Sequence, residues 1–133
     1  TTKATSATED SDGQGQVTIT AAVVTVDENG KIVSCKLDTS DNTVKYTNDG
    51  KAISNGEFKT KYEQGDAYNM VQYGGAKLEW YAQADAFEGA IVGKTLTAIK
   101  ALMGSDLKGN DEIIAAGCTI TIEGFVYAIE KLG

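Results

Sequence analysis

The chain has 133 residues, which is enough for one domain with a hydrophobic core and too few for two. Its 12 Lys and Arg against 19 Asp and Glu give a formal net charge of −7, which argues against a nucleic-acid backbone or an anionic membrane surface as partner. The chain contains no histidine, so Ser-His-Asp and Cys-His catalysis are excluded and the commonest transition-metal ligand is missing.

The first 15 residues are polar and rich in Thr, Ser, Asp and Gly, without apolar periodicity. This composition predicts a flexible polar tether over residues 1–15, followed by a single domain over residues 16–133. Two interpretations of the tether stay open. It is either an ordinary frayed terminus or the tether of a mature, surface-anchored extracellular protein whose N-terminal anchor lies outside this chain.

Two hairpins are predicted in the first half of the domain. Residues 16–26, QVTITAAVVTV, alternate in the pattern of a strand, and the alternation slips at 24–26, which indicates a bulge. Asn29-Gly30 favours a tight turn into a second strand over 31–38. A further strand over 43–47 returns through a turn at 48–51 to a short strand at Ala52 and Ile53. The apolar side of the 31–38 strand is expected to carry Val33, Cys35 and Leu37.

A polar segment over residues 54–75 separates the strands from the helices, and it contains four glycines and three tyrosines. A loop of this length is usually functional or partly structured. Tyr62, Tyr68 and Tyr73 are candidates for an aromatic rim that holds a planar ligand. The alternative is that the tyrosine rings cover a face of the sheet.

Three helices are predicted, near 76–92, 95–103 and 122–132, from apolar residues at helical spacing. Strands followed by helices indicate an α+β fold, with an antiparallel sheet built from N-terminal hairpins and covered on one face by about three helices. The residues expected in a common core are Trp80, Phe87, Phe125, Ile129, Val33 and Leu37.

The turn Ala-Ala-Gly-Cys-Thr-Ile-Thr, residues 115–121, precedes the last predicted helix. Free N–H groups at a helix N-terminus favour anions, Gly117 permits close backbone approach, and Thr119 and Thr121 add hydroxyl donors. The competing interpretation is structural, with Thr121 capping the helix and the small residues packing under the sheet.

Carboxylates and cysteines give weaker signals. Two close pairs, Asp85 with Glu88 and Glu63 with Asp66, suit acid–base chemistry or a hard cation, but an acidic solvated face explains them equally, so no catalytic or metal residue is assigned. Cys35 and Cys118 are either joined in a disulfide or are buried free thiols.

Taken together, the strand ENGKIVSCKLD, the loop EQGDAYNM, the helix end FEGAIVGKTL and the GCT turn before a closing helix resemble a known family. The layout is similar to the FMN-binding domain of sodium-pumping and Rnf-type electron-transfer complexes. It resembles more closely a group of predicted lipoproteins of anaerobic Gram-positive bacteria. The resemblance covers residues 16–133.

The resemblance implies a flavin phosphate near Gly117, Cys118 and Thr119, with Thr119 in the position of the family's flavin-carrying threonine. Cys118 replaces the usual alanine, and Ile113 stands where the family's flavin-transfer motif begins with aspartate. We therefore expect non-covalent binding of FMN or another planar anionic ligand, at Gly117, Cys118, Thr119, Thr121, Tyr68 and Tyr73. The alternative is a ligand-free extracellular protein-interaction module on the same fold, and an enzyme is the least favoured class.

Overall fold

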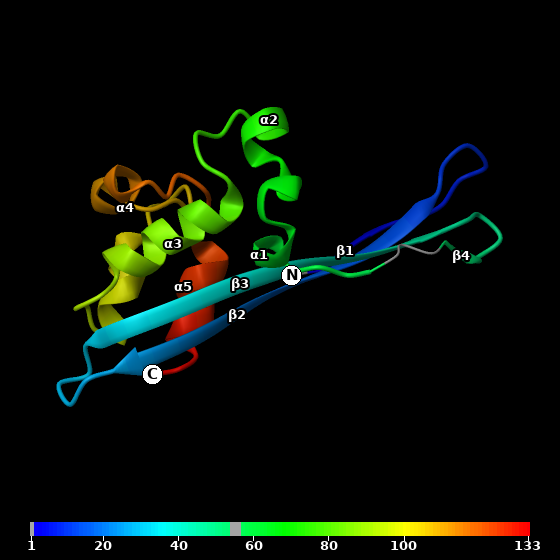
Figure 1. Ribbon diagram of the computed structural model, residues 1–133. Coiled ribbons are helices and arrows are strands. Elements are labelled where there is room, and N and C mark those ends of the chain that lie inside the picture. The colour runs from blue at the N-terminus through cyan, green and yellow to red at the C-terminus, as the bar shows by residue number, and fades with distance from the viewer. Residues whose placement is uncertain (1, 54–56) are drawn as a thin grey trace.

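The computed structural model describes residues 2–53 and 57–133, and it has an α+β fold, as the order of predicted elements indicated. The sheet is antiparallel, with four strands in the order β1-β2-β3-β4. The strands are β1 (Thr2–Thr5), β2 (Gly13–Val26), β3 (Ile32–Tyr46) and β4 (Ala52–Ile53). The two long strands form a ribbon, and the helices cover one face at the end that carries the β2–β3 turn (Figure 1).

The bulge predicted near residues 24–26 is present, and it explains an error in the predicted core. Thr25 pairs with Ser34 and Val26 pairs with Ile32, so Val33 is the extra residue on β3. The bulge therefore removes Val33 from the alternation that places Cys35 and Leu37 inward. Val33 is 56% exposed, and the prediction that it belongs to the core is wrong.

The face of the β2–β3 ribbon that meets the helices does not carry the more apolar side of β2. Leu37 and Thr39 of β3 are buried beneath the helices, opposite Ala22 and Thr20 of β2. The more apolar side of β2 faces away from the helices, and Val23 is 70% exposed. This outer face of β2 carries Val17, Ile19, Ala21 and Val23.

At the far end of the ribbon, the first residues form a strand where a polar tether was predicted. Thr2–Thr5 pair antiparallel with Gln14–Val17, with Thr2 opposite Val17. The Tyr46 ring covers Gly13, where a Cβ atom would overlap the ring, and the Tyr46 hydroxyl donates to the Thr5 carbonyl at 3.0 Å. The short return at β4 was predicted and lies opposite Lys45 and Tyr46.

Most of the polar segment between the sheet and the first long helix is made of short helical turns. Its elements are α1 (Lys61–Gln64), the 3-10 turn η1 (Gly65–Tyr68) and α2 (Met70–Gly74). A capping box starts α1, because the Thr60 hydroxyl accepts from the Glu63 N–H and the Glu63 carboxylate accepts from the Thr60 N–H. Residues 54–56 of this segment lie outside the described residues.

All three predicted helices are present, although each is shorter than expected. They are α3 (Trp80–Ala90), the 3-10 helix η2 (Leu96–Leu102) and α5 (Glu123–Glu130). A fourth, α4 (Asp111–Ala116), was not predicted. Asn110 caps α4 through a 3.2 Å hydrogen bond from the Ile113 N–H, and Gly117 ends it with a φ of 115°.

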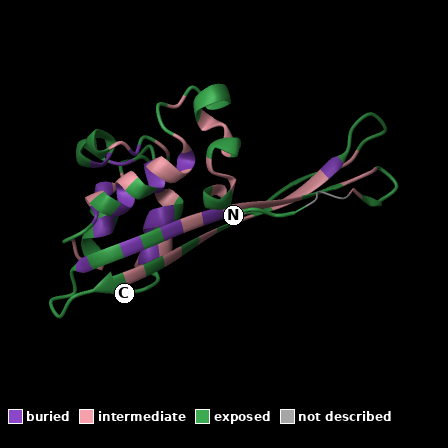
Figure 2. Cartoon of the chain, in the orientation of Figure 1, coloured by how far each residue is buried: buried purple, intermediate pink, exposed green. Residues whose placement is uncertain are grey.

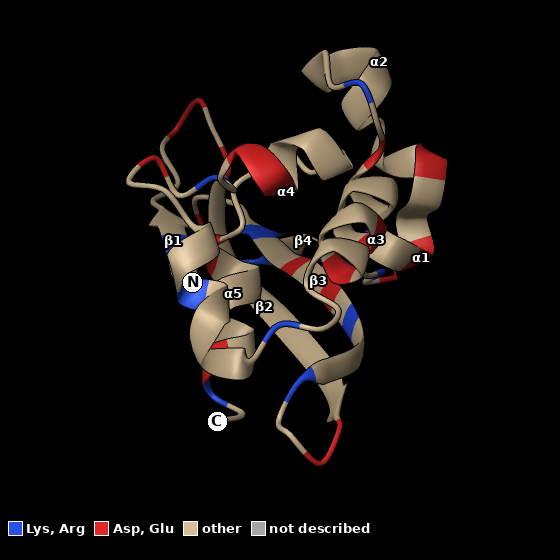
Figure 3. Cartoon of the chain, turned by 90° about the vertical axis from the view of Figure 1, so that its left-hand side faces the viewer, with Lys and Arg blue, Asp and Glu red and all other residues tan. Residues whose placement is uncertain are grey.

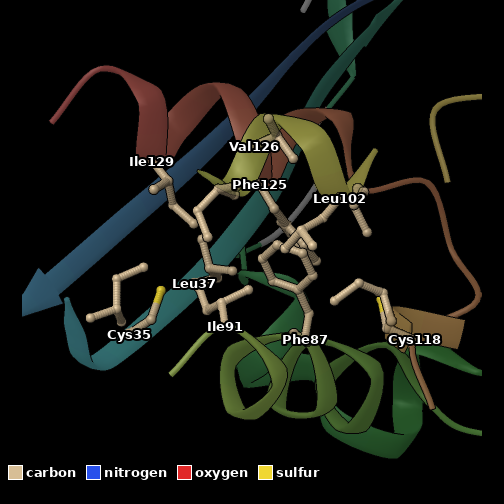
Figure 4. Close-up of a cluster of buried hydrophobic side chains, with 14 of the residues drawn as sticks. Cys35, Leu37, Phe87, Ile91, Leu102, Cys118, Phe125, Val126 and Ile129 are labelled. Carbon is tan, nitrogen blue, oxygen red and sulfur yellow. The ribbon is translucent and has the colours of Figure 1, made fainter. Parts of the chain in front are cut away.

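A single hydrophobic core lies between the sheet and the helices (Figure 2). The predicted members Trp80, Phe87, Phe125, Ile129 and Leu37 are all buried. Figure 4 shows Phe87 and Phe125 side by side at the centre of this cluster, and their ring centroids are 5.4 Å apart. The helical stripes therefore identified the core correctly, and the error was confined to the bulged strand.

The two cysteines are free thiols. Both are buried, and Figure 4 shows Cys35 at one end of the core cluster and Cys118 at the other. Burial raises the pKa of each thiol to about 11. Of the two interpretations left open by the sequence, the structure therefore contains the buried free thiols.

Candidate ligand groove

A hollow lies between the inner face of the sheet and α5, and we call it the β2–α5 groove. Its volume is about 760 Å³. The sheet, the short turns over 61–70, the start of α3 and the first two turns of α5 all contribute to its walls. Residues that line it include Thr20, Ala22, Lys61, Tyr68, Trp80 and Thr121.

Lys61 places a positively charged ammonium group in the wall of the β2–α5 groove. Its ammonium lies 3.0 Å from the Asp41 carboxylate, 5.1 Å from the Tyr68 ring centroid and 5.8 Å from the Trp80 ring centroid. Burial alone lowers the pKa of Lys61, but interactions with Tyr68 and Asp41 outweigh it and raise the pKa. The charge is therefore retained, between two aromatic faces that suit a cation or a planar ring.

Asp41 is held in place from two sides. The Thr18 hydroxyl donates to its carboxylate at 2.6 Å, and Lys61 contacts the other oxygen. Burial by itself raises the pKa of Asp41, but the hydrogen bonds from Thr18 and Lys61 outweigh it and lower the pKa below its ordinary value of 3.8. The pair fixes the direction of the Lys61 side chain at the wall of the groove.

The side chain of Gln83 on α3 holds the turn over residues 115–121 in place through hydrogen bonds. The Gln83 side chain is 1% exposed. Its carbonyl oxygen accepts from the Thr119 N–H at 2.8 Å, the Thr119 hydroxyl at 3.0 Å and the Ile120 N–H at 3.2 Å. The hydroxyl of Thr119 thus has a structural partner, and Thr119 lies outside the lining of the groove.

Thr121 and the start of α5 do belong to the groove. The N-cap of α5 is Ile122, without a side-chain cap, so Thr121 does not cap the helix. Thr121 instead lines the groove, next to Glu123 and Gly124. A Cβ atom on Gly124 would lie 3.0 Å from the Thr20 hydroxyl oxygen, so glycine permits the close approach of α5 to β2.

The other proposed binding residues are distributed over the molecule. Tyr68 is half-buried in the wall of the groove, whereas Tyr73 is 79% exposed and outside it. Gly117 ends α4, and Cys118 is part of the core. The structure thus brings Tyr68 and Thr121 together, and it places Gly117, Cys118, Thr119 and Tyr73 elsewhere.

The carboxylate pairs noted in the sequence have local partners. Asp85 and Glu88 both contact the Lys36 ammonium, at 3.0 and 2.8 Å. Glu88 also accepts a hydrogen bond from the Leu37 N–H at 2.8 Å, on the edge of β3 that faces α3.

The second carboxylate pair, Glu63 and Asp66, also has local partners. Glu63 belongs to the α1 capping box, and Asp66 accepts a hydrogen bond from the Tyr81 hydroxyl. Within residues 2–53 and 57–133, no group of three or more acidic or cysteine residues has the geometry of a metal site.

Sequence reasoning did not identify Lys61, Asp41 or Trp80 as lining or supporting residues of a site. One local signal was available for Lys61, because Thr60 and Glu63 have the spacing of a capping box and place Lys61 in the first turn of a helix. No local signal connects Asp41 with Lys61, because the contact joins a strand to a helix that follows 20 residues later.

In comparisons with protein-family models, curated proteins and solved structures, no match to this chain was found. None of the helices in the described residues is both long enough and apolar enough to cross a bilayer.

Proposed function

We propose that the chain is a binding domain that holds a flavin, or a similar planar anionic small molecule, non-covalently in the β2–α5 groove. The observation that carries the proposal is the convergence of Tyr68 and Trp80 around the charged Lys61 in a groove that also reaches Thr121. An aromatic wall with a few convergent polar groups is the usual composition of a small-molecule site.

The two parts of such a ligand, its ring system and its anionic group, need different surroundings in the groove. The ring system of a flavin requires an aromatic or apolar wall, which Tyr68 and Met70 supply, whereas Trp80 adds little surface because it is 4% exposed. An anionic group would meet the first-turn N–H groups of α5 beside Thr121, next to Glu123, and Lys61, whose charge is already paired with Asp41 at 3.0 Å. The net charge of −7 opposes an anion at long range, so ring contacts must supply much of the affinity.

Non-covalent attachment follows from the turn that resembles the family motif. The Thr119 hydroxyl donates to buried Gln83, so a covalent bond to a flavin phosphate at that oxygen would break this hydrogen bond. Ile113 also replaces the aspartate with which the family's transfer motif begins. We therefore place the ligand against Tyr68 and Thr121, without a bond to Thr119.

The test is a fluorescence titration of FMN with ~100 μM protein, a level at which a dissociation constant of ~100 μM is measurable. We expect quenching of the flavin, and a roughly 2- to 10-fold weaker affinity for Tyr68→Ala because one ring contact is lost. Tyr73→Ala is the matched control, since the Tyr73 ring lies outside the groove, and its affinity should equal that of the wild type.

A second pair of variants tests the position of the anionic group. Thr121→Ala should weaken FMN binding more than it weakens riboflavin binding, whereas Thr119→Ala should affect neither. Absence of any fluorescence change with FMN and riboflavin contradicts the proposal. Loss of binding in Thr119→Ala but not in Thr121→Ala contradicts the placement.

The cellular setting is part of the proposal and rests on the family resemblance, since Thr2–Thr5 form strand β1 instead of the expected tether. We propose that the domain belongs to an exported protein held at the cell surface through an N-terminal lipid anchor outside this chain. Surface proteolysis of intact cells that make the parent protein tests this. Protection of the domain until the cells are lysed contradicts it.

A further inference from the structure

The sheet is polar where it lines the β2–α5 groove. Thr18 and Thr20 of β2 face the groove, whereas the side chain of Ile19 between them is 56% exposed on the outer face. On the neighbouring strand, Thr39 lies opposite Thr20 and is 6% exposed. We call Thr18, Thr20 and Thr39 the threonine floor of the groove. Burial of hydroxyl groups costs free energy unless they are hydrogen-bonded, so the partners of these three hydroxyls decide what the floor can bind.

Hydrogen bonds between β2 and β3 use part of the hydrogen-bonding capacity of the threonine floor. The Thr18 hydroxyl donates to the Asp41 carboxylate at 2.6 Å, and the hydroxyls of Thr20 and Thr39 share one hydrogen bond of 3.0 Å. Each threonine hydroxyl has one proton and two acceptor lone pairs, so the bond between Thr20 and Thr39 uses one of their two protons. The other proton and the remaining lone pairs can bond a molecule in the groove, which both residues line.

The threonine floor carries no charge of its own. Strand β2 contains no Lys, Arg, Asp or Glu from Gly13 to Val26, and Figure 3 shows it uncharged beside α5. The charged residues that line the groove, Lys61, Glu123 and Lys131, belong to its other walls. A charged group loses far more hydration than a hydroxyl when it is buried. The floor therefore favours neutral groups that donate and accept hydrogen bonds.

The threonine floor extends from the aromatic wall of the groove to the start of α5. At one end, Thr18 and Lys61 bond the same carboxylate, and the Lys61 ammonium lies 5.1 Å from the Tyr68 ring centroid. At the other end, a Cβ atom on Gly124 would lie 3.0 Å from the Thr20 hydroxyl oxygen. Residues two apart on a strand are ~6.6 Å apart, which an extended chain of about five carbon atoms spans.

We propose that the threonine floor is a subsite for a polyhydroxylated chain, such as the ribityl chain that joins the ring of a flavin to its phosphate. The chain lies along β2, between Tyr68 and the first turn of α5. Its hydroxyls exchange hydrogen bonds with the Thr20–Thr39 pair and accept from the Lys61 ammonium, which has three N–H donors. This inference deepens the proposed function, and it rests on that function for the position of the ring.

The first test compares riboflavin with lumiflavin, which has the same ring but a methyl group in place of the ribityl chain. Both molecules are neutral, so a difference in affinity reports the chain and not a charge. Fluorescence titration with ~100 μM protein detects a dissociation constant of ~100 μM. We expect riboflavin to bind at least about 5-fold more tightly than lumiflavin, because the chain makes two or more net hydrogen bonds.

A double variant removes the central hydroxyls of the floor. Thr20→Val combined with Thr39→Val replaces both partners of one hydrogen bond by apolar groups of the same shape, so neither hydroxyl is left buried without its partner. Riboflavin should then bind within about 2-fold of lumiflavin, and the affinity for lumiflavin should not change. Thr20→Ser keeps the hydroxyl and should keep the preference for riboflavin.

The strands offer a matched control for the double variant. Thr25 and Ser34 form another hydroxyl pair between β2 and β3, at 2.7 Å, and both lie outside the groove. Thr25→Val combined with Ser34→Ala removes two hydroxyls from the same strands, and the preference for riboflavin should stay as in the wild type. If the Thr20 and Thr39 double variant fails to fold, the comparison of the two flavins on the wild type decides.

Ribitol alone distinguishes a free sugar alcohol from the chain of a flavin. Amide NMR of the labelled full chain with ~200 mM ribitol detects a dissociation constant of ~100 mM. Shift changes at Thr20 and Thr39 that the double valine variant lacks, with Thr25 and Ser34 unchanged, assign the subsite to polyols in general. No response to ribitol, together with a riboflavin preference that the valine variant loses, assigns it to the flavin chain.

Two results with flavins overturn the inference. The first is equal affinity of the wild type for riboflavin and lumiflavin, and the second is a preference for riboflavin that survives in the double valine variant. If FMN, riboflavin and lumiflavin all fail to bind, the proposed function fails and ribitol decides the inference separately. A ribitol response at Thr20 and Thr39 then supports the polyol subsite, and no response overturns it.

Discussion

Gln83 of α3 holds Thr119 by both its backbone N–H and its hydroxyl, through a single carbonyl oxygen at 2.8 and 3.0 Å. The residues are 36 positions apart, and Gln83 is almost completely buried. A third hydrogen bond comes from the Ile120 N–H. The turn that resembles a cofactor motif is thus supported from within the core, which gives Thr119 a structural role that is independent of any ligand.

Replacing this glutamine should destabilise the fold. Gln83→Leu leaves the N–H groups of Thr119 and Ile120 without their acceptor, and we expect a loss of at least about 2 kcal/mol in the free energy of unfolding. Thr119→Val removes only the hydroxyl and should cost about 0.5–1.5 kcal/mol. Urea denaturation measures both, and equal losses for the two variants would contradict the role assigned to Gln83.

The centre of the core should be sensitive to truncation. Phe125 packs against Phe87 and Trp80, with ring centroids 5.4 and 5.7 Å away. Phe125→Ala should lower the free energy of unfolding by roughly 3–5 kcal/mol, because a large cavity is left in a closed site. Tyr127→Ala, two residues later on the exposed side of α5, is the control and should cost far less. An unfolding midpoint of Phe125→Ala equal to that of the wild type would contradict the buried position of Phe125.

Stability should fall at acid pH in a way that depends on Asp41. The pKa of Asp41 is lower in the folded chain than its ordinary value of 3.8, because Thr18 and Lys61 stabilise the carboxylate more than burial disfavours it. The resulting stabilisation is complete above this ordinary value and is lost as the pH falls through the lower, folded pKa. Because the ion pair between Asp41 and Lys61 is partly exposed to solvent, we expect it to contribute at most about 1–3 kcal/mol to the free energy of unfolding.

Asp41→Asn provides the control for this pH dependence. The variant should be less stable than the wild type at pH 7, because Lys61 loses its partner, and the difference should shrink below about pH 4. Denaturation curves at pH 7, 5, 4 and 3 measure the effect, with pH values chosen around the ordinary carboxyl pKa. A difference that stays constant down to pH 3 would show that Asp41 does not carry the effect.

Both thiols should be unreactive in the folded chain. Burial raises the pKa of Cys35 and of Cys118 to about 11, so little thiolate forms at pH 8. A thiol reagent should therefore label neither residue quickly in native buffer, and should label both in denaturant without any reductant. Finding no free thiol in denaturant would instead demonstrate a disulfide.

Local pattern was sufficient for much of the architecture. The Asn29-Gly30 turn, the short return at β4 and the apolar stripes of α3 and α5 were all predicted, because each depends on residues within a few positions of one another. The predicted core followed from the same stripes. The capping signals of α1 and α4 were also local, at Thr60 and Asn110, although the prediction did not use them.

The sequence of β2 alone does not show which of its two faces points towards the helices. Its more apolar side, with Ile19 and Val23, faces outward, and Thr20 faces inward, where it bonds the Thr39 hydroxyl at 3.0 Å. Register along a hairpin places the residues of both strands on common faces, so the buried Leu37 and Thr39 on β3 determine which side of β2 meets the helices. The Val33 bulge is a second consequence of this pairing.

The sequence by itself determined the α+β class, the acidic character without histidine, the main helices and most of the core, because composition and short-range periodicity carry that information. Only the tertiary structure decided that Tyr68, Lys61 and Thr121 line one groove and that the Thr119 hydroxyl is hydrogen-bonded to Gln83. The physical reason is that these relationships join residues tens of positions apart, and packing of helices on the sheet, rather than local propensity, brings them together.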